Sequence, residues 1–388
     1  MDIIPRINLS QEVEKALTSN PIVVLQGPRQ CGKTTLARQL NVPPTHYFDL
    51  DDPFDQIRLE ENARTTLSSL SGLIIIDEAQ RKPDLFPLLR FMADRPNQPA
   101  RFLLLGSSSS LLLKQVSESL AGRAQFIDMT GLMLHDVGTE HWQDLWIKGS
   151  FPRAFQQASD ISLRWRMDYL QQFVNRDLRD LGETKLSDIQ VRRLLQFIAA
   201  SNGQAWNHSN AGKTIGVNYK TIQRHLELFR TAFIVRELSV YDDNTHKRLR
   251  KAPTIYLRDS GLVHALMQIY DHSQLLAHPA LGSSWESFAL EQVIGTLGLR
   301  EDQCFTWSLQ SGAEMDLVFR QEGQLYGIEF KHTDTPRTTR SFSTAFEQLD
   351  LKAAAIVHGG SKSWSLGEDK FAISIQELSE LKSHFGLT

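Results

Sequence analysis

The sequence is poor in cysteine and contains no long apolar run. Its 2 cysteines, Cys31 and Cys304, are too few for a disulfide framework, so a reducing compartment fits the chain. No apolar stretch approaches the ~20 residues needed to cross a bilayer. The segment Met1–Arg6 also lacks the charge pattern and length of a signal peptide. We therefore expect a cytoplasmic protein with no membrane partner.

An excess of positive charge is also missing. The formal net charge is −3 at pH 7, so any binding of nucleic acid must depend on local patches. With 41% hydrophobic and 22% charged residues the composition is that of an ordinary globular protein, and 388 residues suggest two or three domains. Because composition points to no particular activity, function has to be inferred from motifs.

The clearest motif is a phosphate-binding loop that directly follows a strand-like run. The apolar residues Ile22–Leu25 lead into Gly27-Pro28-Arg29-Gln30-Cys31-Gly32-Lys33-Thr34, which fits G-x-x-x-x-G-K-[ST], and a helix-like stretch begins at Thr35. The two glycines let backbone N–H groups point at phosphate oxygens, and the following helix adds its positive N-terminal end. Lys33 can reach the β- and γ-phosphates, and the Thr34 hydroxyl can bind Mg²⁺. We predict an ATP site over Gly27–Thr35; the alternative is a plain glycine-rich turn.

A second strand-like run ends in two carboxylates. Leu73–Ile76 are four consecutive apolar residues, which is typical of a parallel strand covered on both faces. Asp77 and Glu78 follow at its carboxyl end, where α/β sheets bind ligands. We predict that Asp77 holds Mg²⁺, directly or through water, and that Glu78 orients and deprotonates the water that attacks the γ-phosphate.

Two further positions are candidates for contact with the nucleotide. A third buried strand, Arg101–Leu105, ends near Ser107 and Ser108, either of which can contact the γ-phosphate or the attacking water. The alternative is that these serines cap a helix that starts near Leu111. Arg123 lies just before a short last strand, Gln125–Met129.

Together these residues resemble an AAA+ ATPase. In that superfamily an arginine in the place of Arg123 is the finger that enters the ATP site of the neighbouring subunit, and such a residue can raise the rate by ~10³–10⁵. The alternative is an arginine solvated at a helix end. The resemblance extends over almost the whole chain to one prokaryotic branch, in which an AAA+ core precedes a C-terminal region of long-undefined function. It implies ATP and Mg²⁺ as cofactors and a homo-oligomeric ring, expected to be a hexamer. The motifs that carry it are Gly27–Gln30, Ile76–Gln80, Gly106–Ser108, Leu120–Arg123, Gly149–Pro152 and Arg176–Leu178.

The predicted fold class is α/β, with a parallel sheet in the ATPase core and a smaller α/β domain at the end of the chain. An amphipathic helix, Asn8–Ser19, precedes the first strand. The predicted parts are an AAA+ P-loop core (1–135), a helical lid or linker (136–186), a winged helix (187–245), a basic connector (246–280) and a PD-(D/E)XK nuclease-like domain (281–388).

The stretch Asp188–Leu238 has the pattern of a helix-turn-helix followed by a strand. In its second helix, Tyr219–Thr231, Ile222, Leu226 and Phe229 are spaced to face inward, which leaves Lys220 and Arg224 outward. A winged helix places this helix against the major groove. The alternative is a winged helix used only as a protein scaffold. We favour contact with DNA because a basic segment follows the predicted wing and contains Lys247, Arg248 and Arg250.

The last part of the chain carries a second set of acidic residues. Glu286 lies near the start of a predicted helix, and Asp316 lies in a predicted strand. Glu329 and Lys331 are two apart in the partner strand, so both side chains lie on one face. This order is similar to the PD-(D/E)XK nucleases, which implies that the carboxylates hold Mg²⁺ while the lysine positions water. The alternative is a degenerate module in which Lys331 forms a salt bridge with Glu329 or Asp316.

Three functions remain open from the sequence. The preferred one is a Mg²⁺-dependent AAA+ ATPase that couples hydrolysis to binding or remodelling of DNA, including branched or junction forms. The second is a metal-dependent DNA nuclease gated by ATP. The third is a signalling or antitoxin-like NTPase switch that binds a protein partner. A flat salt dependence, or no affinity for DNA, would favour the third.

Overall fold

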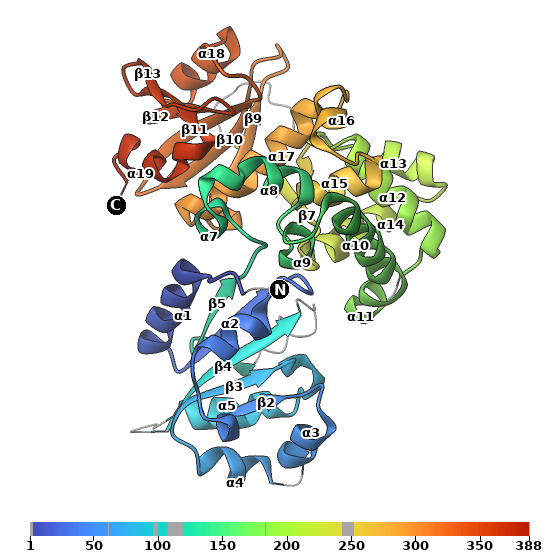
Figure 1. Ribbon diagram of the computed structural model, residues 1–388, viewed down its shortest axis with the longest axis vertical. Helices are drawn as coiled ribbons and strands as arrows, with labels where there is room; N and C mark the ends of the chain where they lie inside the picture. The colour runs from blue at the N-terminus through green and yellow to red at the C-terminus, as the bar shows by residue number, and fades with distance from the viewer. Residues whose placement is uncertain are drawn as a thin grey trace. The chain divides into compact units, whose positions relative to one another are not determined.

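The computed structural model describes residues 3–60, 62–95, 100–107, 119–182, 184–242 and 252–387. The chain divides into two compact units, which are described separately (Figure 1). Unit 1 comprises Met1–Gly131, Asn175–Thr184 and Thr231–Phe233, and unit 2 comprises Leu132–Val174, Lys185–Arg230 and Ile234–Thr388. The predicted α/β class is confirmed. The boundaries of the five predicted domains are finer than these units and remain predictions.

Unit 1 contains a five-stranded parallel sheet within the described residues, in the order β2-β3-β4-β1-β5. Because every strand runs the same way, the phosphate loop after β1 and the carboxylate at the end of β3 lie at the same edge. The predicted strands are all present, with ends shifted by one or two residues. Their bounds are β1 (Ile22–Gly27), β2 (Tyr47–Asp49), β3 (Gly72–Asp77), β4 (Ala100–Ser107) and β5 (Ala124–Asp128).

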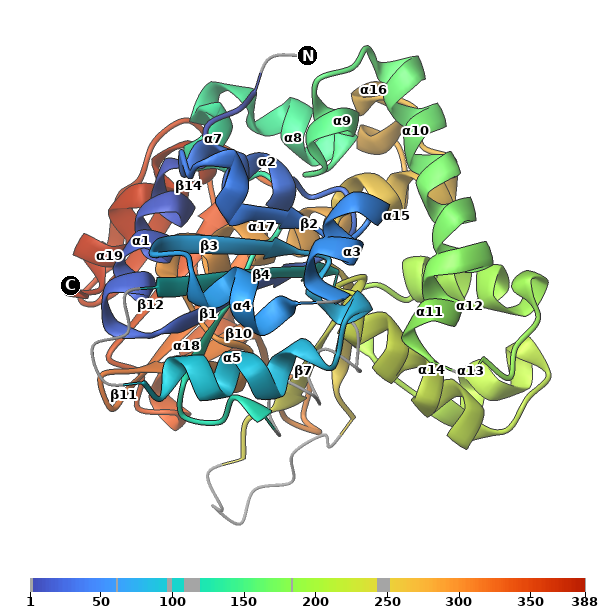
Figure 2. The ribbon, with the colours of Figure 1, turned by 90° about the horizontal axis from the view of Figure 1, so that it is seen from below.

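Helices cover both faces of this sheet, as the unbroken apolar runs of its strands require. Alternate residues of β1 face opposite ways: Val24 packs with one apolar cluster and Val23 with the other. In Figure 2, α2 and α5 lie on opposite sides of β3 and β4. The helices of the first face are α3 (Pro53–Glu60), α4 (Ala63–Ser68) and α5 (Leu85–Ala93), and those of the second are α1 (Ile7–Ser19) and α2 (Lys33–Gln39).

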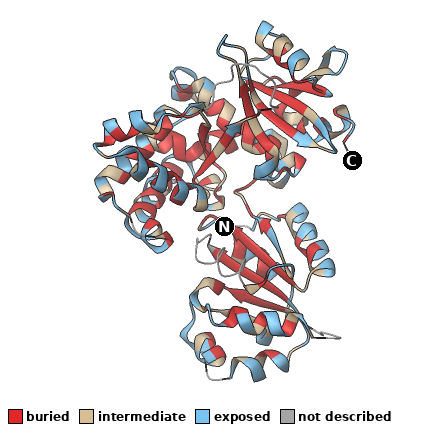
Figure 3. Cartoon of the chain, turned by 180° about the vertical axis from the view of Figure 1, so that it is seen from behind, coloured by how far each residue is buried: buried red, intermediate tan, exposed pale blue. Residues whose placement is uncertain are grey.

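Unit 2 contains a nine-stranded mixed sheet within the described residues, in the order β13-β14-β12-β11-β10-β9-β7-β8-β6. Strands β10 and β11 form the predicted antiparallel hairpin, and β12 joins β11 in parallel. Buried residues fill the central strands of this sheet (Figure 3). The bounds are β6 (Gln204–Ala205), β7 (Val235–Val240), β8 (Thr254–Leu257), β9 (Cys304–Ser308), β10 (Glu314–Gln321), β11 (Gln324–Lys331), β12 (Ala353–His358), β13 (Trp364–Gly367) and β14 (Lys370–Ser374).

One long buried helix of unit 2, α17 (Leu281–Leu297), contacts β11. On α17 the Trp285 ring lies 5.2 Å from that of Trp146, whose Nε1 donates to Ser284 Oγ at 2.9 Å. This packing fixes the rotation of α17 and thereby the place of Glu286. The other helices are α7 (Leu134–Val137), α8 (Trp142–Lys148), α9 (Pro152–Phe155), α10 (Ser159–Gln172), α12 (Asp188–Ala200), α13 (His208–Ile215), α14 (Tyr219–Thr231), α15 (Ser260–Met267), α16 (His272–Leu276), α18 (Arg340–Gln348) and α19 (Leu381–His384).

One predicted helix is interrupted. The stretch Ile375–Phe385 divides into a 3₁₀ segment, Ile375–Glu380, and the short α19. The 3₁₀ segment itself is kinked at Glu377, whose φ of −110° is not helical and whose carboxylate accepts a hydrogen bond from the backbone N–H of Ser363 at 2.6 Å. In the described ranges, none of the helices is both long and apolar enough to span a bilayer.

Candidate nucleotide-binding site

The phosphate loop, Gly27–Thr34, turns sharply between β1 and α2. Gln30 and Gly32 both have a positive φ, 62° and 106°, which turns successive backbone N–H groups toward one side. Gly27 is required for a different reason: a Cβ there would lie 2.1 Å from the carbonyl oxygen of Met129. The spacing of the glycines therefore follows from the shape of the loop.

Lys33 is buried at the start of α2, beneath this loop. Its Nζ donates to the carbonyl oxygens of Gly27 at 2.9 Å and Pro28 at 2.8 Å. The ammonium group therefore lies against the loop itself, and contact with a phosphate would exchange these two bonds. Of the other loop residues, Cys31 packs in an apolar cluster of the sheet, and Thr35 is exposed on α2.

Thr34 and Asp77 meet at the carboxyl edge of the sheet. Thr34 Oγ1 donates to Asp77 Oδ2 at 2.8 Å, and the Tyr47 hydroxyl donates to the same oxygen at 2.7 Å. Burial, with Asp77 as neighbour, raises the pKa of Tyr47, so this hydroxyl remains a donor. A hydroxyl and a carboxylate held together are the hard oxygen ligands that Mg²⁺ prefers. The residues present therefore fit the predicted Mg²⁺ of a bound nucleotide.

Glu78 follows Asp77 with a φ of 54°, a conformation that is uncommon outside glycine. Such backbone strain is often found at functional sites, where the surrounding structure maintains it. Burial raises the pKa of Glu78, while a hydrogen bond from Gln80 acts in the opposite direction. A carboxylate with a raised pKa, beside the predicted Mg²⁺ ligands, has the properties of a general base for water.

The end of β4 lies next to the phosphate loop, as predicted. Ser107 is aligned with Gly27 in the parallel register, so its backbone is at the correct edge. Its side chain and the whole of Ser108 lie outside the described residues. The choice between nucleotide contact and helix capping is therefore still a prediction.

Arg123 lies at the opposite edge, because β5 begins at Ala124 and pairs there with Ile22 at the start of β1. Ile22 and Gly27 are the two ends of the strand β1, and the five steps between them correspond to roughly 17 Å. The guanidinium forms a forked ion pair with Asp94, with Nε–Oδ1 at 2.5 Å and Nη2–Oδ2 at 2.8 Å. The hydrogen bond from Arg123 lowers the pKa of Asp94. Arg123 is therefore too far from the loop of its own unit to contact a nucleotide there.

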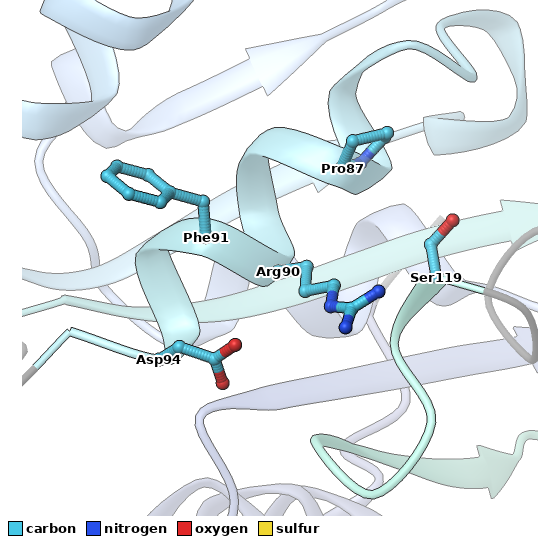
Figure 4. A pocket seen from close by; sticks show the side chains of 5 residues that line it. All are labelled: Pro87, Arg90, Phe91, Asp94 and Ser119. Atoms are coloured by element: carbon cyan, nitrogen blue, oxygen red, sulfur yellow. The ribbon is translucent and has the colours of Figure 1, made fainter.

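A surface hollow of about 420 Å³ lies beside this ion pair and includes Asp94 in its wall (Figure 4). Phe91 is 47% exposed there. The guanidinium groups of Arg64 and Arg95 lie 5.0 and 4.8 Å from the centre of its ring. The hollow is lined by Pro87, Arg90, Phe91, Asp94 and Ser119.

A contact that the sequence did not reveal joins the phosphate loop to a distant segment of unit 1. Arg29 Nη1 donates to Asp177 Oδ1, and Arg29 Nη2 lies 3.5 Å from Asp180 Oδ2. Asp177 ends a π-helical turn, Phe173–Asp177, that runs into the short helix α11 (Leu178–Leu181). Arg29 and Asp177 are 148 positions apart, and no local pattern in the sequence indicates such a pair.

Unit 2 brings the predicted acidic residues together. Lys331 Nζ lies 2.9 Å from Glu329 Oε1, which is the salt bridge considered as the alternative from sequence. Asp316 Oδ2 accepts a hydrogen bond from the backbone of Phe330 at 2.8 Å. Burial raises the pKa of Glu286 to about 9 and that of Asp316 to about 7, and the neighbouring carboxylates contribute to both rises. Among the described residues, no group of three His, Cys, Asp or Glu side chains is arranged to hold a metal ion.

The residues predicted to contact DNA are only partly described. On α14, Ile222, Leu226 and Phe229 are buried, as predicted, and Lys220 and Arg224 are exposed. The basic residues Lys247, Arg248 and Arg250 lie outside the described part of the chain. Their contribution to any DNA contact stays a prediction.

Three family models match successive parts of the chain. An AAA domain matches residues 19–137, which include the loop and the carboxylates of unit 1. A domain of unknown function (DUF8612) matches residues 139–273, and another domain of unknown function (DUF4143) matches residues 281–378. A solved structure, the Walker-type ATPase PABY2304 of Pyrococcus abyssi, has a TM-score of 0.51 at 17% identity, over 69% of this chain and 96% of that chain. At that identity the likeness shows the fold alone.

Two mycobacterial proteins are similar over nearly the whole chain. They are "Uncharacterized protein Mb2031c" of Mycobacterium bovis and "Uncharacterized protein Rv2008c" of Mycobacterium tuberculosis. Each is 39% identical over 378 residues, or 97% of this chain and 85% of the relative. The chain therefore belongs to the same family as these two mycobacterial proteins, and its unit 1 carries a P-loop ATPase domain of the AAA type.

Proposed function

We propose that this P-loop ATPase hydrolyses ATP with Mg²⁺ and couples hydrolysis to binding or remodelling DNA, as a homo-oligomeric ring. The observation that carries the ATPase part is the meeting of Thr34, Asp77 and Glu78 at one edge of the parallel sheet, beside the phosphate loop. This edge combines backbone donors for phosphate, oxygen ligands for a divalent cation, and a carboxylate of raised pKa.

Each residue has a distinct task in this site. The N–H groups of the loop and the ammonium of Lys33 would bind the phosphates, and Thr34 and Asp77 would hold Mg²⁺. Bound Mg²⁺ supplies charge stabilisation at the phosphoryl oxygens. Glu78 orients a water and takes its proton. Tyr47 keeps Asp77 oriented through its 2.7 Å hydrogen bond.

The test is ATP turnover of the full chain, measured without DNA and with single-stranded, duplex and four-way-junction DNA. Lys33→Ala should abolish nucleotide binding and turnover. Stimulation by one DNA form would identify the substrate. If Lys33→Ala retained the turnover of the unaltered chain, the ATPase assignment would be wrong. If turnover were normal but no DNA form bound or stimulated, only the DNA part would fail.

The order of elements in unit 2 supports the DNA part of the proposal. Helix α12, strand β6, helices α13 and α14, and strands β7 and β8 follow one another, and β6-β8-β7 form adjacent strands. This order would suit a winged helix, in which α14 would be the helix placed against the major groove. Lys220 and Arg224 are exposed basic residues on α14 that contact with phosphate would use.

Charge removal on α14 tests this surface. The double variant Lys220→Ala/Arg224→Ala should weaken DNA binding and reduce the slope of log affinity against log salt by about 2. Lys15→Ala, at an exposed position on α1, is the matched control and should leave both unchanged. An unchanged salt slope in the double variant would exclude α14 as the DNA surface.

The position of Arg123 supports assembly into a ring. It lies at the edge opposite the phosphate loop, so it would act on the nucleotide of a neighbour, and for that it must leave Asp94. Mixing Lys33→Ala subunits with Arg123→Ala subunits should restore part of the turnover that each lacks alone, because some sites then combine an intact loop with an intact arginine. Mixtures that never exceed the separate variants would argue against a shared site.

A second candidate function rests on the carboxylate cluster of unit 2. Its elements follow the order α17, β9, β10, β11, α18 and β12, and Glu329 Oε2 is buried without a hydrogen-bond partner among the described residues. An unpartnered buried carboxylate oxygen favours a cation nearby. Labelled DNA incubated with Mg²⁺ or Mn²⁺ should then be cut, with loss of cutting in Glu329→Ala. No cleavage of any DNA form would rule out this activity.

A further inference from the structure

The pair formed by Arg29 and Asp177 places a cation of the phosphate loop against carboxylates of another segment. Arg29 is two positions after Gly27, on the loop that would surround the phosphates. Its side chain is 30% exposed, and that of Asp177 is 13% exposed. Both residues belong to unit 1, since Asn175–Thr184 is part of it.

The two carboxylates differ in how tightly they hold the guanidinium. Asp177 accepts a direct hydrogen bond from Arg29, whereas Asp180 is 3.5 Å away and its side chain is 59% exposed. Burial raises the pKa of Asp177, and the charge of Arg29 acts against that rise. Asp177 therefore depends on Arg29 for compensation of its charge, and Asp180 much less so.

A triphosphate on this loop would compete for the same guanidinium. The terminal phosphate carries more negative charge than a carboxylate, and a guanidinium binds phosphate oxygens through the same forked geometry. A bound triphosphate and the carboxylates of Asp177 and Asp180 would also repel each other. ADP lacks the terminal group and would compete less.

We propose that Arg29 exchanges Asp177 for the terminal phosphate of ATP, so that this pair distinguishes ATP from ADP and releases the 175–184 segment when ATP is bound. This inference rests on the proposed nucleotide site. Asp177 is then a positioning residue that opposes ATP binding, and Arg29 is a ligand of the terminal phosphate. The π-helical turn at Phe173–Asp177 fits this role, because such turns are rare and frequently occur at functional sites.

The two partners should therefore have opposite effects on ATP affinity. Equilibrium binding of a fluorescent ATP analogue and the matching ADP analogue to the full chain measures both. Arg29→Ala should weaken ATP binding by about tenfold and ADP binding by less than about twofold, since only ATP presents the terminal phosphate. Asp177→Asn should tighten ATP binding by about fivefold, because it removes the carboxylate that competes with phosphate for Arg29. Glu14→Gln, at an exposed position on α1, is the control for loss of one carboxylate and should change either affinity by less than about twofold.

The double variant and hydrogen exchange separate this role from a structural one. Arg29→Ala/Asp177→Asn should bind ATP as weakly as Arg29→Ala, since the competitor matters only when the guanidinium is present. Backbone amides of 175–184 should exchange faster with ATP than with ADP in the unaltered chain, and equally with both in Arg29→Ala. Arg29→Lys keeps the positive charge but lacks the forked guanidinium, so its ATP affinity should lie between that of the unaltered chain and that of Arg29→Ala.

The inference is overturned if Arg29→Ala and Asp177→Asn both weaken ATP binding, or if they change the affinities for ATP and ADP equally. It is also overturned if exchange at 175–184 does not respond to ATP in a chain that binds it. These outcomes differ from failure of the nucleotide site itself, in which the unaltered chain would bind neither nucleotide and Lys33→Ala would have nothing to remove.

Discussion

The sheet edge of unit 1 and the acidic cluster of unit 2 use similar residues in different ways. In unit 1, Asp77 accepts hydrogen bonds from the hydroxyls of Thr34 and Tyr47, and Lys33 is bound to backbone carbonyls. In unit 2, Lys331 is paired directly with Glu329, and the nearby carboxylates of Glu286 and Asp316 have pKa values raised to about 9 and about 7.

The difference lies in what surrounds each carboxylate. The hydroxyls of Thr34 and Tyr47 are neutral, so they carry no charge that would be left unpaired when they turn from Asp77 toward a bound group. The Thr34–Asp77 pair therefore suits exchange with Mg²⁺. The cluster of unit 2 instead combines burial with repulsion among like charges, which favours the protonated forms. The first arrangement suits a ligand, whereas the second is stabilised by protonation.

The largest effect is expected from neutralising the carboxylate beside the first site. Glu78→Gln should lower ATP turnover by ~10²–10⁴, because the amide cannot take a proton from water. Nucleotide binding should be nearly unchanged, since Glu78 is not expected to contact the phosphates. Glu368→Gln, at an exposed position in unit 2, is the control for loss of one charge. Turnover of Glu78→Gln within about twofold of the unaltered chain would remove Glu78 as the base.

Two glycines extend the comparison to backbone packing. A Cβ at Gly27 would meet the backbone oxygen of Met129 at 2.1 Å, whereas one at Gly327 on β11 would meet the tip of the Leu351 side chain at 2.6 Å. Backbone cannot move aside as a side chain can, so Gly27→Ala should destabilise unit 1 by about 3 kcal/mol and Gly327→Ala should destabilise unit 2 by about 1 kcal/mol. Calorimetry of the two variants measures both; a smaller loss in Gly27→Ala than in Gly327→Ala would contradict the close approach of Met129 to the loop.

The sequence predicted which side chains meet at the sheet edge of unit 1, because the evidence for them is local. The motif Gly27–Thr34 and the run Leu73–Glu78 each specify a strand and the residues at its end, and parallel strands bring those ends to one edge. The same holds for Glu329 and Lys331, whose spacing of two places both on one face of β11. Local periodicity therefore sufficed for most strands and for the composition of both acidic sites.

Contacts between distant segments could not be predicted in this way. The pair of Arg29 with Asp177 and that of Arg123 with Asp94 depend on tertiary packing, and both partners are common surface residues without a distinctive pattern. The kink at Glu377 was missed because the apolar spacing around it is compatible with a continuous helix, while a side-chain hydrogen bond to Ser363 N–H favours the kink.

A further effect is expected from pH, and the acidic cluster of unit 2 should contribute to it. The folded-state pKa values of Asp316 and Glu286, about 7 and about 9, are above the ~4 of an unfolded carboxyl group. The folded state therefore binds more protons than the unfolded state between these limits, and stability falls as pH rises from about 4 to about 9.

Glu286→Gln should flatten this dependence and raise the melting temperature of unit 2 at pH 8, because the amide is neutral at every pH and removes one member of a repelling group. The same substitution should give little gain at pH 5, where protons already neutralise the cluster. Calorimetry of the unaltered chain and of Glu286→Gln at the two pH values measures these melting temperatures. If stability instead rose with pH and Glu286→Gln left the slope unchanged, these carboxylates would be ionised in the folded state without an energetic penalty. The acidic cluster of unit 2 would then hold compensated carboxylates, as the sheet edge of unit 1 does.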